Sequence, residues 1–270
     1  MDSKEDIMGA IAELQAFVPT QRTAVPALAT EPEAIPRVST GCSNCNLREI
    51  CLPCGLTSRD VDQVEELIYA RRRVRRGEFL YRAGNAFNSL YAVRSGFFKT
   101  SQTLEDGREQ ITAFYMAGEI MGMDGIGPEK HACNAIALED SEVCVILYSR
   151  LETLSRHLPG LQQQFHKVMS REIAREHGVM LLLGSMRAEE RLAAFLLNLS
   201  QRFVARGYSG HEFVLRMTRE EIGSYLGLKL ETVSRAFSRF QEEGFIGVQH
   251  KHVQILDEVG LRGAIGQAAH

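Results

Sequence analysis

The 270-residue sequence has no long apolar run, and this absence excludes one large class of proteins. No uninterrupted apolar stretch reaches the roughly 18 residues that a membrane span requires. The segment that begins Met1-Asp2-Ser3 also lacks the basic run leading into an apolar one that is typical of a secretory signal peptide. We therefore expect a cytoplasmic protein with no membrane partner.

An excess of charge of one sign is also missing, because the net charge is −3. Residues 187–270 carry eleven Lys and Arg against ten Asp and Glu, so any nucleic-acid surface must be confined to particular helix faces. There is no Gly-rich nucleotide fingerprint. His131, His166 and His177 are isolated, as expected of surface or packing residues. An enzyme is therefore not expected.

Cysteine, in contrast, is concentrated near the start of the chain. The pattern Cys42-x2-Cys45-x5-Cys51-x2-Cys54 places four thiols within thirteen residues. Since a cytosolic chain keeps its thiols reduced, clustered cysteines favour a metal or iron–sulfur centre over disulfides. Spacing alone would select these four as ligands. A structural zinc loop and a thiol redox couple remain alternatives.

The periodicity of the chain predicts an α+β fold with five segments. Residues 1–41, rich in Ala, Pro, Thr and Glu, predict a flexible leader with at most one short amphipathic helix near its start. The cysteine loop follows at 42–56, and a helical pattern begins at Ser58. Recurrent glycines, short apolar strands and the turn Asp106-Gly107 predict an antiparallel sandwich or barrel within 57–160.

A long helix is predicted over residues 161–187, because no proline follows Pro159. Its residues at alternating spacings of three and four form a heptad seam. The seam could pack on its own domain, but the length of the helix favours a homodimer interface. An acidic residue on the seam would make such a dimer weak and adjustable. The seam residues are Ile173, Glu176, Met180 and Leu183.

Residues 218–239 predict a helix-turn-helix. Thr218 and Glu221 fit a capping box, and Gly227 supplies the turn before a second helix from about Leu230. One face of that helix is apolar and the other is polar, as in any surface helix. The polar face, however, offers an acceptor, a hydroxyl and a guanidinium that can contact base edges in the major groove. The candidate base-contacting residues are Glu231, Ser234 and Arg235.

Two apolar segments, 245–248 and 253–256, flank His250-Lys251-His252 and predict a strand pair, or wing, after the second helix. The wing completes a winged helix-turn-helix domain over 188–270. A helical hairpin with a solvated polar face remains the alternative for the motif alone.

The order of cysteine loop, β-roll, long helix and winged helix-turn-helix resembles that of the CRP/FNR transcription regulators, and in particular of their oxygen-sensing FNR branch. The resemblance covers about residues 42–256. It rests on specific motifs at 188–195, 198–200, 222–228 and 231–235, supported by shorter matches at 91–96 and 109–112.

The resemblance implies a cyclic-nucleotide-binding type of β-roll followed by a dimerisation helix and a winged helix-turn-helix. It implies one oxygen-labile [4Fe–4S] cluster per subunit and a homodimer that binds an inverted repeat of TTGAT type in double-stranded DNA. Oxygen would convert the cluster to [2Fe–2S], weaken the dimer and release DNA. RNA polymerase would be a partner, contacted near Gly107, Tyr208 and Ser209.

The resemblance also changes the expected ligand set. The family takes three ligands from the loop and one from the β-roll, which implies Cys42, Cys45, Cys51 and Cys144. Ligation by Cys144 would tie the loop to the roll, whereas Cys54 would leave a self-contained loop. We expect Cys133 to be an ordinary buried thiol.

The nucleotide-binding relatives hold ribose and phosphate with a Gly-Glu pair and an Arg-Ser pair. The corresponding positions here are Gly122-Met123 and His131-Ala132. Without the carboxylate and the guanidinium, the cyclic phosphate lacks its bidentate partner. No cyclic nucleotide is therefore expected to bind.

Overall fold

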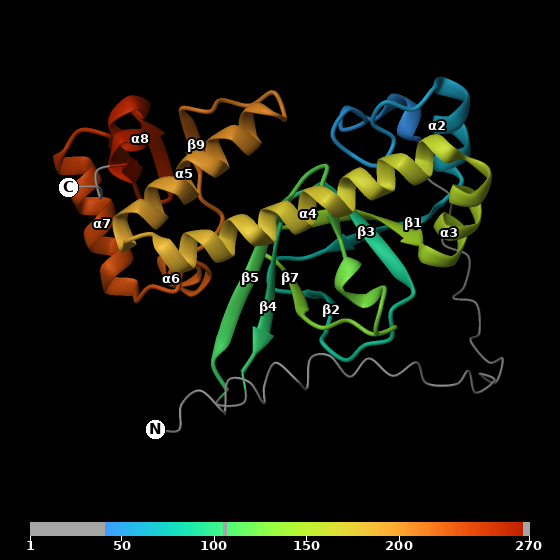
Figure 1. Cartoon of the computed structure of the whole chain (residues 1–270), viewed down its shortest axis with the longest axis horizontal. Helices are drawn as coiled ribbons and strands as arrows, with labels where there is room; N and C mark the ends of the chain where they lie inside the picture. Colours follow the sequence, from blue (N-terminus) through green and yellow to red (C-terminus); the bar gives the residue numbers. More distant parts are fainter. Residues whose placement is uncertain (1–40, 105–106, 267–270) are drawn as a thin grey trace. The chain divides into compact units, whose positions relative to one another are not determined.

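The computed structural model describes residues 41–104 and 107–266 (Figure 1). The predicted leader, with its short amphipathic helix, lies outside the described residues apart from Gly41. No helix in the described part of the chain is long and apolar enough to cross a membrane.

Two four-stranded antiparallel sheets form the N-terminal domain, with strand orders β1-β8-β3-β6 and β2-β7-β4-β5. We call it the sensor domain after the role that the family resemblance implies. Phe98 and Val143 are fully buried between them, as expected for the inward faces of paired sheets. The predicted antiparallel sandwich or barrel is confirmed. Its strands are β1 (Ile68–Val74), β2 (Phe79–Tyr81), β3 (Ser89–Ser95), β4 (Phe97–Thr103), β5 (Glu109–Met116), β6 (Ile120–Met121), β7 (Asn134–Ala137) and β8 (Ser141–Leu147).

Short helices close one end of the sensor domain. The predicted helix at Ser58 is confirmed as α2 (Ser58–Glu65), which Thr57 caps by accepting a hydrogen bond from the Asp60 amide at 3.3 Å. Val61 and Val64 of α2 are buried in the same core as Leu151 of α3 (Tyr148–His157). Two 3-10 turns complete this part of the fold: η1 (Cys42–Asn44) and η2 (Met123–Gly125).

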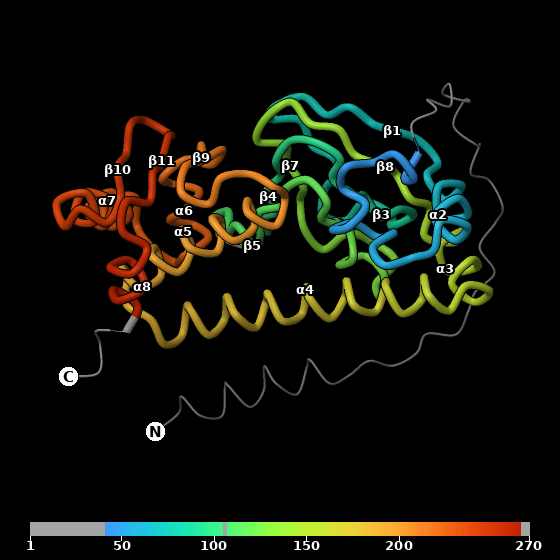
Figure 2. The backbone as a smooth tube through the Cα atoms, turned by 90° about the horizontal axis from the view of Figure 1, so that it is seen from above, coloured from blue at the N-terminus to red at the C-terminus, as the bar shows by residue number. Residues whose placement is uncertain are grey.

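A single long helix, α4 (Pro159–Ser185), runs beside the strands and leads to the C-terminal domain (Figures 1 and 2). Pro159 occupies its first turn, where a missing backbone N–H does no harm. Leu161, Phe165 and Val168 are buried against the sensor domain. Ile173 and Met180 are instead 53% and 61% exposed, so the second half of α4 presents apolar side chains to solvent.

The C-terminal domain has a core of Leu196, Ile222 and Phe240 and a three-stranded sheet of order β10-β11-β9. The predicted helix-turn-helix and wing are confirmed, while β9 adds a strand that the sequence pattern did not reveal. The elements are α5 (Ala188–Val204), β9 (Glu212–Val214), α6 (Arg219–Leu226), α7 (Leu230–Glu242), β10 (Ile246–Gln249), β11 (His252–Ile255) and α8 (Glu258–Gly266).

The sensor strands and the C-terminal domain share one apolar cluster. Phe114 of β5 packs on Phe195 and Tyr225, with ring centroids 6.1 and 5.2 Å away. Ser224 of α6 also accepts a hydrogen bond from the Ile111 amide at 2.9 Å and donates one to the Glu109 carbonyl at 3.1 Å. Strand β5 therefore carries both apolar and polar contacts to α6.

Candidate functional site: a cysteine pocket and a helix-turn-helix

The cysteine loop is held in place by its own apolar residues. Leu47, Leu52 and Leu56 are buried beneath it, and the Cys51 amide donates to the Leu47 carbonyl at 2.9 Å. Arg48 fixes the far end of the loop by donating from Nη2 to the Leu56 carbonyl at 3.0 Å. The thiols are thus carried on an anchored loop rather than on a free one.

Four of the six cysteines line one pocket. Cys42, Cys45 and Cys51 reach it from the loop, and Cys144 reaches it from β8. Cys144 pairs with Ala92 of β3 on one side and Arg71 of β1 on the other, so it sits on an inner strand of its sheet. The fold therefore brings together thiols that are far apart in the sequence.

The remaining two cysteines lie elsewhere. Cys54 is half-buried but does not line this pocket. Cys133 is buried in a separate core and donates a hydrogen bond from Sγ to Asp124 Oδ2 at 3.3 Å. The pocket thus contains the four cysteines of the expected ligand set and neither of the others.

Burial raises the pKa of three of the pocket thiols, those of Cys42, Cys51 and Cys144. Burial, reinforced by Cys144 and Cys45, raises the pKa of Cys42 to about 12, and burial also raises the pKa of Cys51 to about 12. Burial raises the pKa of Cys144 as well, although Arg71 and Arg94 oppose the shift. Because thiolates bind metals, loading a centre here would release protons and neutralise the repulsion.

The lining of the pocket fits a metal centre bound by thiolates. Zinc–thiolate bonds of about 2.3 Å would bring four sulfurs within roughly 4 Å of one another. Among the described residues, no group of three or more His, Cys, Asp or Glu side chains could hold a single metal ion. Four thiols that line one pocket match the all-cysteine donor set of an iron–sulfur cluster.

The second candidate site is the helix-turn-helix. Thr218 Oγ1 accepts from the Glu221 amide at 3.1 Å, and Glu221 Oε2 accepts from the Thr218 amide at 2.7 Å, which is the predicted capping box. Gly227 adopts φ +63° at the turn, a conformation that L side chains rarely adopt. The capping box fixes where α6 begins, and Gly227 fixes where it ends.

One face of α7 is buried and the other is free. Val233, Phe237 and Phe240 are at most 2% exposed in the domain core. The opposite face exposes Glu231, Ser234 and Arg235. Within the same helix, Arg239 is held by Glu189 at 2.6 Å and by Glu243 at 2.8 Å, so its guanidinium is already paired.

The other predicted contact residues are distributed over the surface. Gly107, Ser209 and Tyr208 are exposed, and Tyr208 is 61% exposed. Glu176 is exposed on α4 beside Ile173 and Met180. Leu183, in contrast, is half-buried and lies near Gly227.

The positions that correspond to the nucleotide-binding pairs of relatives include a buried aromatic cluster around His131. His131 is 2% exposed, and its ring stacks on Tyr81 with centroids 3.8 Å apart. Phe87 meets the same ring edge-on at 5.6 Å. The Asp124 carboxylate lies 3.6 Å from His131 Nδ1 and adds negative charge beside this cluster.

These features define a helix-turn-helix transcription regulator with an N-terminal β-sheet domain. Two family models match the chain in the corresponding regions. The cyclic nucleotide-binding domain matches residues 71–157, and the Crp-like helix-turn-helix domain matches residues 190–264.

Full-length relatives extend this result. The chain is 52% identical to the transcriptional regulatory protein btr of Bordetella pertussis, over 84% of this chain and 93% of that protein. It is 42% identical to the fumarate and nitrate reduction regulatory protein of Salmonella typhimurium, over 87% of this chain and 96% of that protein. The chain therefore belongs to the CRP/FNR family of transcription regulators and is of the FNR type.

A solved structure with the same fold is that of FixK2 from Bradyrhizobium japonicum. It is 30% identical to this chain, covers 72% of it and 96% of the FixK2 chain, and gives a TM-score of 0.67. The expected α+β architecture of sensor domain, long helix and C-terminal helix-turn-helix is thereby confirmed.

Proposed function

We propose that this regulator senses oxygen through one [4Fe–4S] cluster per subunit, held by Cys42, Cys45, Cys51 and Cys144. The observation that carries the proposal is the pocket shared by these four thiols, three from the loop and one from β8. The bound cluster would supply four oxygen-labile iron–thiolate bonds. Ligation of these thiolates would add a link between the loop and the sheet, and their release would remove that link.

The output is a homodimer that binds an inverted repeat of TTGAT type and contacts RNA polymerase. Glu231, Ser234 and Arg235 are free to contact bases, since α7 buries only its opposite face. Ile173 and Met180 would meet their copies across the α4 seam, which would remove exposed apolar surface from water. Polymerase contact is assigned to the exposed surface at Gly107, Tyr208 and Ser209.

The deciding experiment is purification without oxygen, followed by an absorption spectrum and DNA binding before and after air. We expect a brown protein that binds the TTGAT palindrome and loses both its colour and most of its affinity in air. A colourless protein that contains zinc and binds DNA equally in both conditions would refute the proposal.

A first prediction concerns Glu176. In a dimer its carboxylate would face its copy on the seam, and two like charges brought together there oppose association. Glu176→Ala should therefore shift the clusterless protein towards the dimer, as measured by sedimentation velocity in air. Glu152→Ala, which removes an exposed carboxylate from α3, is the control. If Glu176→Ala is as monomeric in air as the unmutated protein, Glu176 does not oppose dimerisation.

A second prediction concerns cyclic nucleotides. The stacked His131 and Tyr81 rings occupy the region of the expected binding site, and no guanidinium replaces the missing phosphate partner at His131-Ala132. Calorimetry with cAMP should show no saturable heat at micromolar concentrations. Saturable binding in that range would show that the side chains move aside and that the assignment is wrong.

A further inference from the structure

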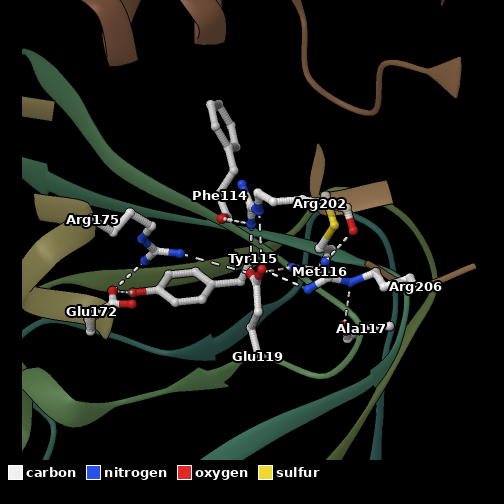
Figure 3. Close-up of polar contacts among 9 residues, drawn as sticks. All are labelled: Phe114, Tyr115, Met116, Ala117, Glu119, Glu172, Arg175, Arg202 and Arg206. Carbon is white, nitrogen blue, oxygen red and sulfur yellow. Dashed lines mark hydrogen bonds and ion pairs between the residues drawn. The ribbon is translucent and has the colours of Figure 1, made fainter. Parts of the chain in front are cut away.

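A mostly buried carboxylate at the β5–β6 turn gathers arginines from two helices (Figure 3). Arg202 of α5 donates to Glu119 through two nitrogens, from Nε to Oε1 at 3.1 Å and from Nη2 to Oε2 at 2.6 Å. Arg206 donates from Nη2 to Oε1 at 2.7 Å. Arg175 of α4 adds an ion pair at 3.9 Å. Glu119 thus connects the sensor domain to both helices.

The same arginines also donate to backbone carbonyls of β5 and of the turn. Arg202 Nη2 donates to the Phe114 carbonyl at 2.7 Å, and Arg206 Nε donates to the Ala117 carbonyl at 2.6 Å. The Met116 amide donates to Glu119 Oε2 at 3.1 Å. This is a built contact in which each charged group has several partners and a defined orientation.

Charge stabilises the contact further. Burial by itself would raise the pKa of Glu119, but Arg202 and Arg206 outweigh it and lower that pKa below its usual range. The carboxylate is therefore ionised at neutral pH. Side-chain exposures of 22% for Glu119, 16% for Arg202 and 6% for Arg206 limit screening by solvent.

The cysteine loop packs on the same turn at Gly118, the residue that precedes Glu119. Gly118 has φ +88°, and a Cβ there would lie 2.6 Å from Cδ1 of Ile50. Ile50 directly precedes Cys51. The Gly118 amide also donates to the Val93 carbonyl at 2.8 Å, and the Val93 amide donates to the Glu119 carbonyl at 2.8 Å. The turn is thus held between the loop and β3.

We propose that Glu119 is a positioning residue, through which the sensor domain holds the DNA-binding domain in the orientation that binds DNA. This inference rests on the proposed cluster function, because Ile50 beside Cys51 is the contact through which the loaded loop supports the turn. The docked arrangement leaves Glu231, Ser234 and Arg235 exposed, so it is compatible with DNA binding. Movement of Ile50 away from Gly118 would loosen the turn and its hold on Arg202 and Arg206.

Another ion pair across the same junction provides a matched control. Arg216 Nε lies 2.9 Å from Glu139 Oε2, but these side chains are 41% and 32% exposed. Exposed ion pairs contribute little to stability. Removal of one partner from a buried pair is costly, because it leaves the other charge buried without a partner. Glu119 and Glu139 therefore differ mainly in burial and in the number of arginines that they hold.

The test compares Glu119→Gln with Glu139→Gln in the full-length protein, purified without oxygen. Glu119→Gln should keep the cluster absorption of the unmutated protein but bind the TTGAT palindrome roughly tenfold more weakly. Glu119→Asp, which keeps the charge, should recover part of the affinity, and Glu139→Gln should bind normally. Wild-type affinity in Glu119→Gln would overturn the proposal.

A double-mutant cycle with Arg202→Gln separates positioning from general destabilisation. If the two residues act as one contact, the double variant should bind DNA no more weakly than the weaker of the two single variants. If the affinity losses of the two single variants instead multiply in the double variant, the proposal is wrong, even if each variant has a lower Tm. If Glu119→Gln does not fold, Arg202→Gln and Arg206→Gln must each show the affinity loss with cluster absorption intact. If the unmutated protein purified without oxygen is colourless, it is the proposed cluster function that is refuted, not the role of Glu119.

Discussion

Replacing Cys144 with alanine should abolish the iron–sulfur absorption of anaerobically purified protein and, with it, high-affinity binding to the TTGAT palindrome. Cys144 lines the pocket from β8, opposite the three loop cysteines. Without its thiolate, Cys42, Cys45 and Cys51 have no partner on the sheet. Absorption spectra, iron content and gel-shift affinity of the same anaerobic sample measure the effect.

The matched control is Cys54→Ala. Cys54 has similar partial burial to Cys144 and belongs to the dense cysteine run, but it does not line the pocket. Its substitution should leave the spectrum, the iron content and the DNA affinity near their wild-type values. If Cys54→Ala loses the cluster and Cys144→Ala retains it, the ligand assignment is reversed and the loop is self-contained.

The contrast between these two cysteines shows what local sequence can and cannot predict. Spacing alone favours Cys54, because residues three apart in a loop are close whatever the fold. Cys144 becomes a neighbour only through the pairing of β8 with β1 and β3. That pairing depends on long-range strand order, which periodicity does not specify. The preference for Cys144 rests on the family resemblance and on the link between loop and β-roll that its ligation would provide.

The helix-turn-helix was predictable for the opposite reason. Its capping box, its Gly227 turn and the amphipathic character of α7 are determined within a few residues of the chain. The buried face of Val233, Phe237 and Phe240 follows directly from helical spacing. Local rules and tertiary packing agree here, so both helices and the wing are predictable from the sequence.

The ion pairs of Glu119 with Arg202 and Arg206 could not be predicted from the sequence. Glu119 follows a glycine in a turn, where an exposed carboxylate is ordinary. Its two principal partners are 83 and 87 residues further along the chain. Only the docking of α5 against the sensor strands brings Arg202 and Arg206 to it, and no spacing rule covers that distance. The same holds for Ile50 and Gly118, which meet through the fold of the cysteine loop.

Substitution of Arg235 by alanine should weaken binding to the palindrome by roughly tenfold to a hundredfold and reduce discrimination at one base pair of each half-site. Arg235 is exposed on the face of α7 opposite the core. Arginine can donate two hydrogen bonds to guanine O6 and N7, an arrangement that other bases do not match. Titration of the palindrome and of single-base variants by fluorescence anisotropy measures both effects.

Arg239 offers a control on the same helix with the same charge. Its guanidinium is paired with Glu189 at 2.6 Å and with Glu243 at 2.8 Å, so contacting DNA would require breaking these pairs. Arg239→Ala should therefore change affinity little and leave base discrimination intact. A uniform loss over all sequences in Arg235→Ala would indicate a phosphate contact instead. Because Arg235→Ala leaves the cysteine pocket untouched, its cluster absorption should stay normal, which separates loss of DNA contact from loss of sensing.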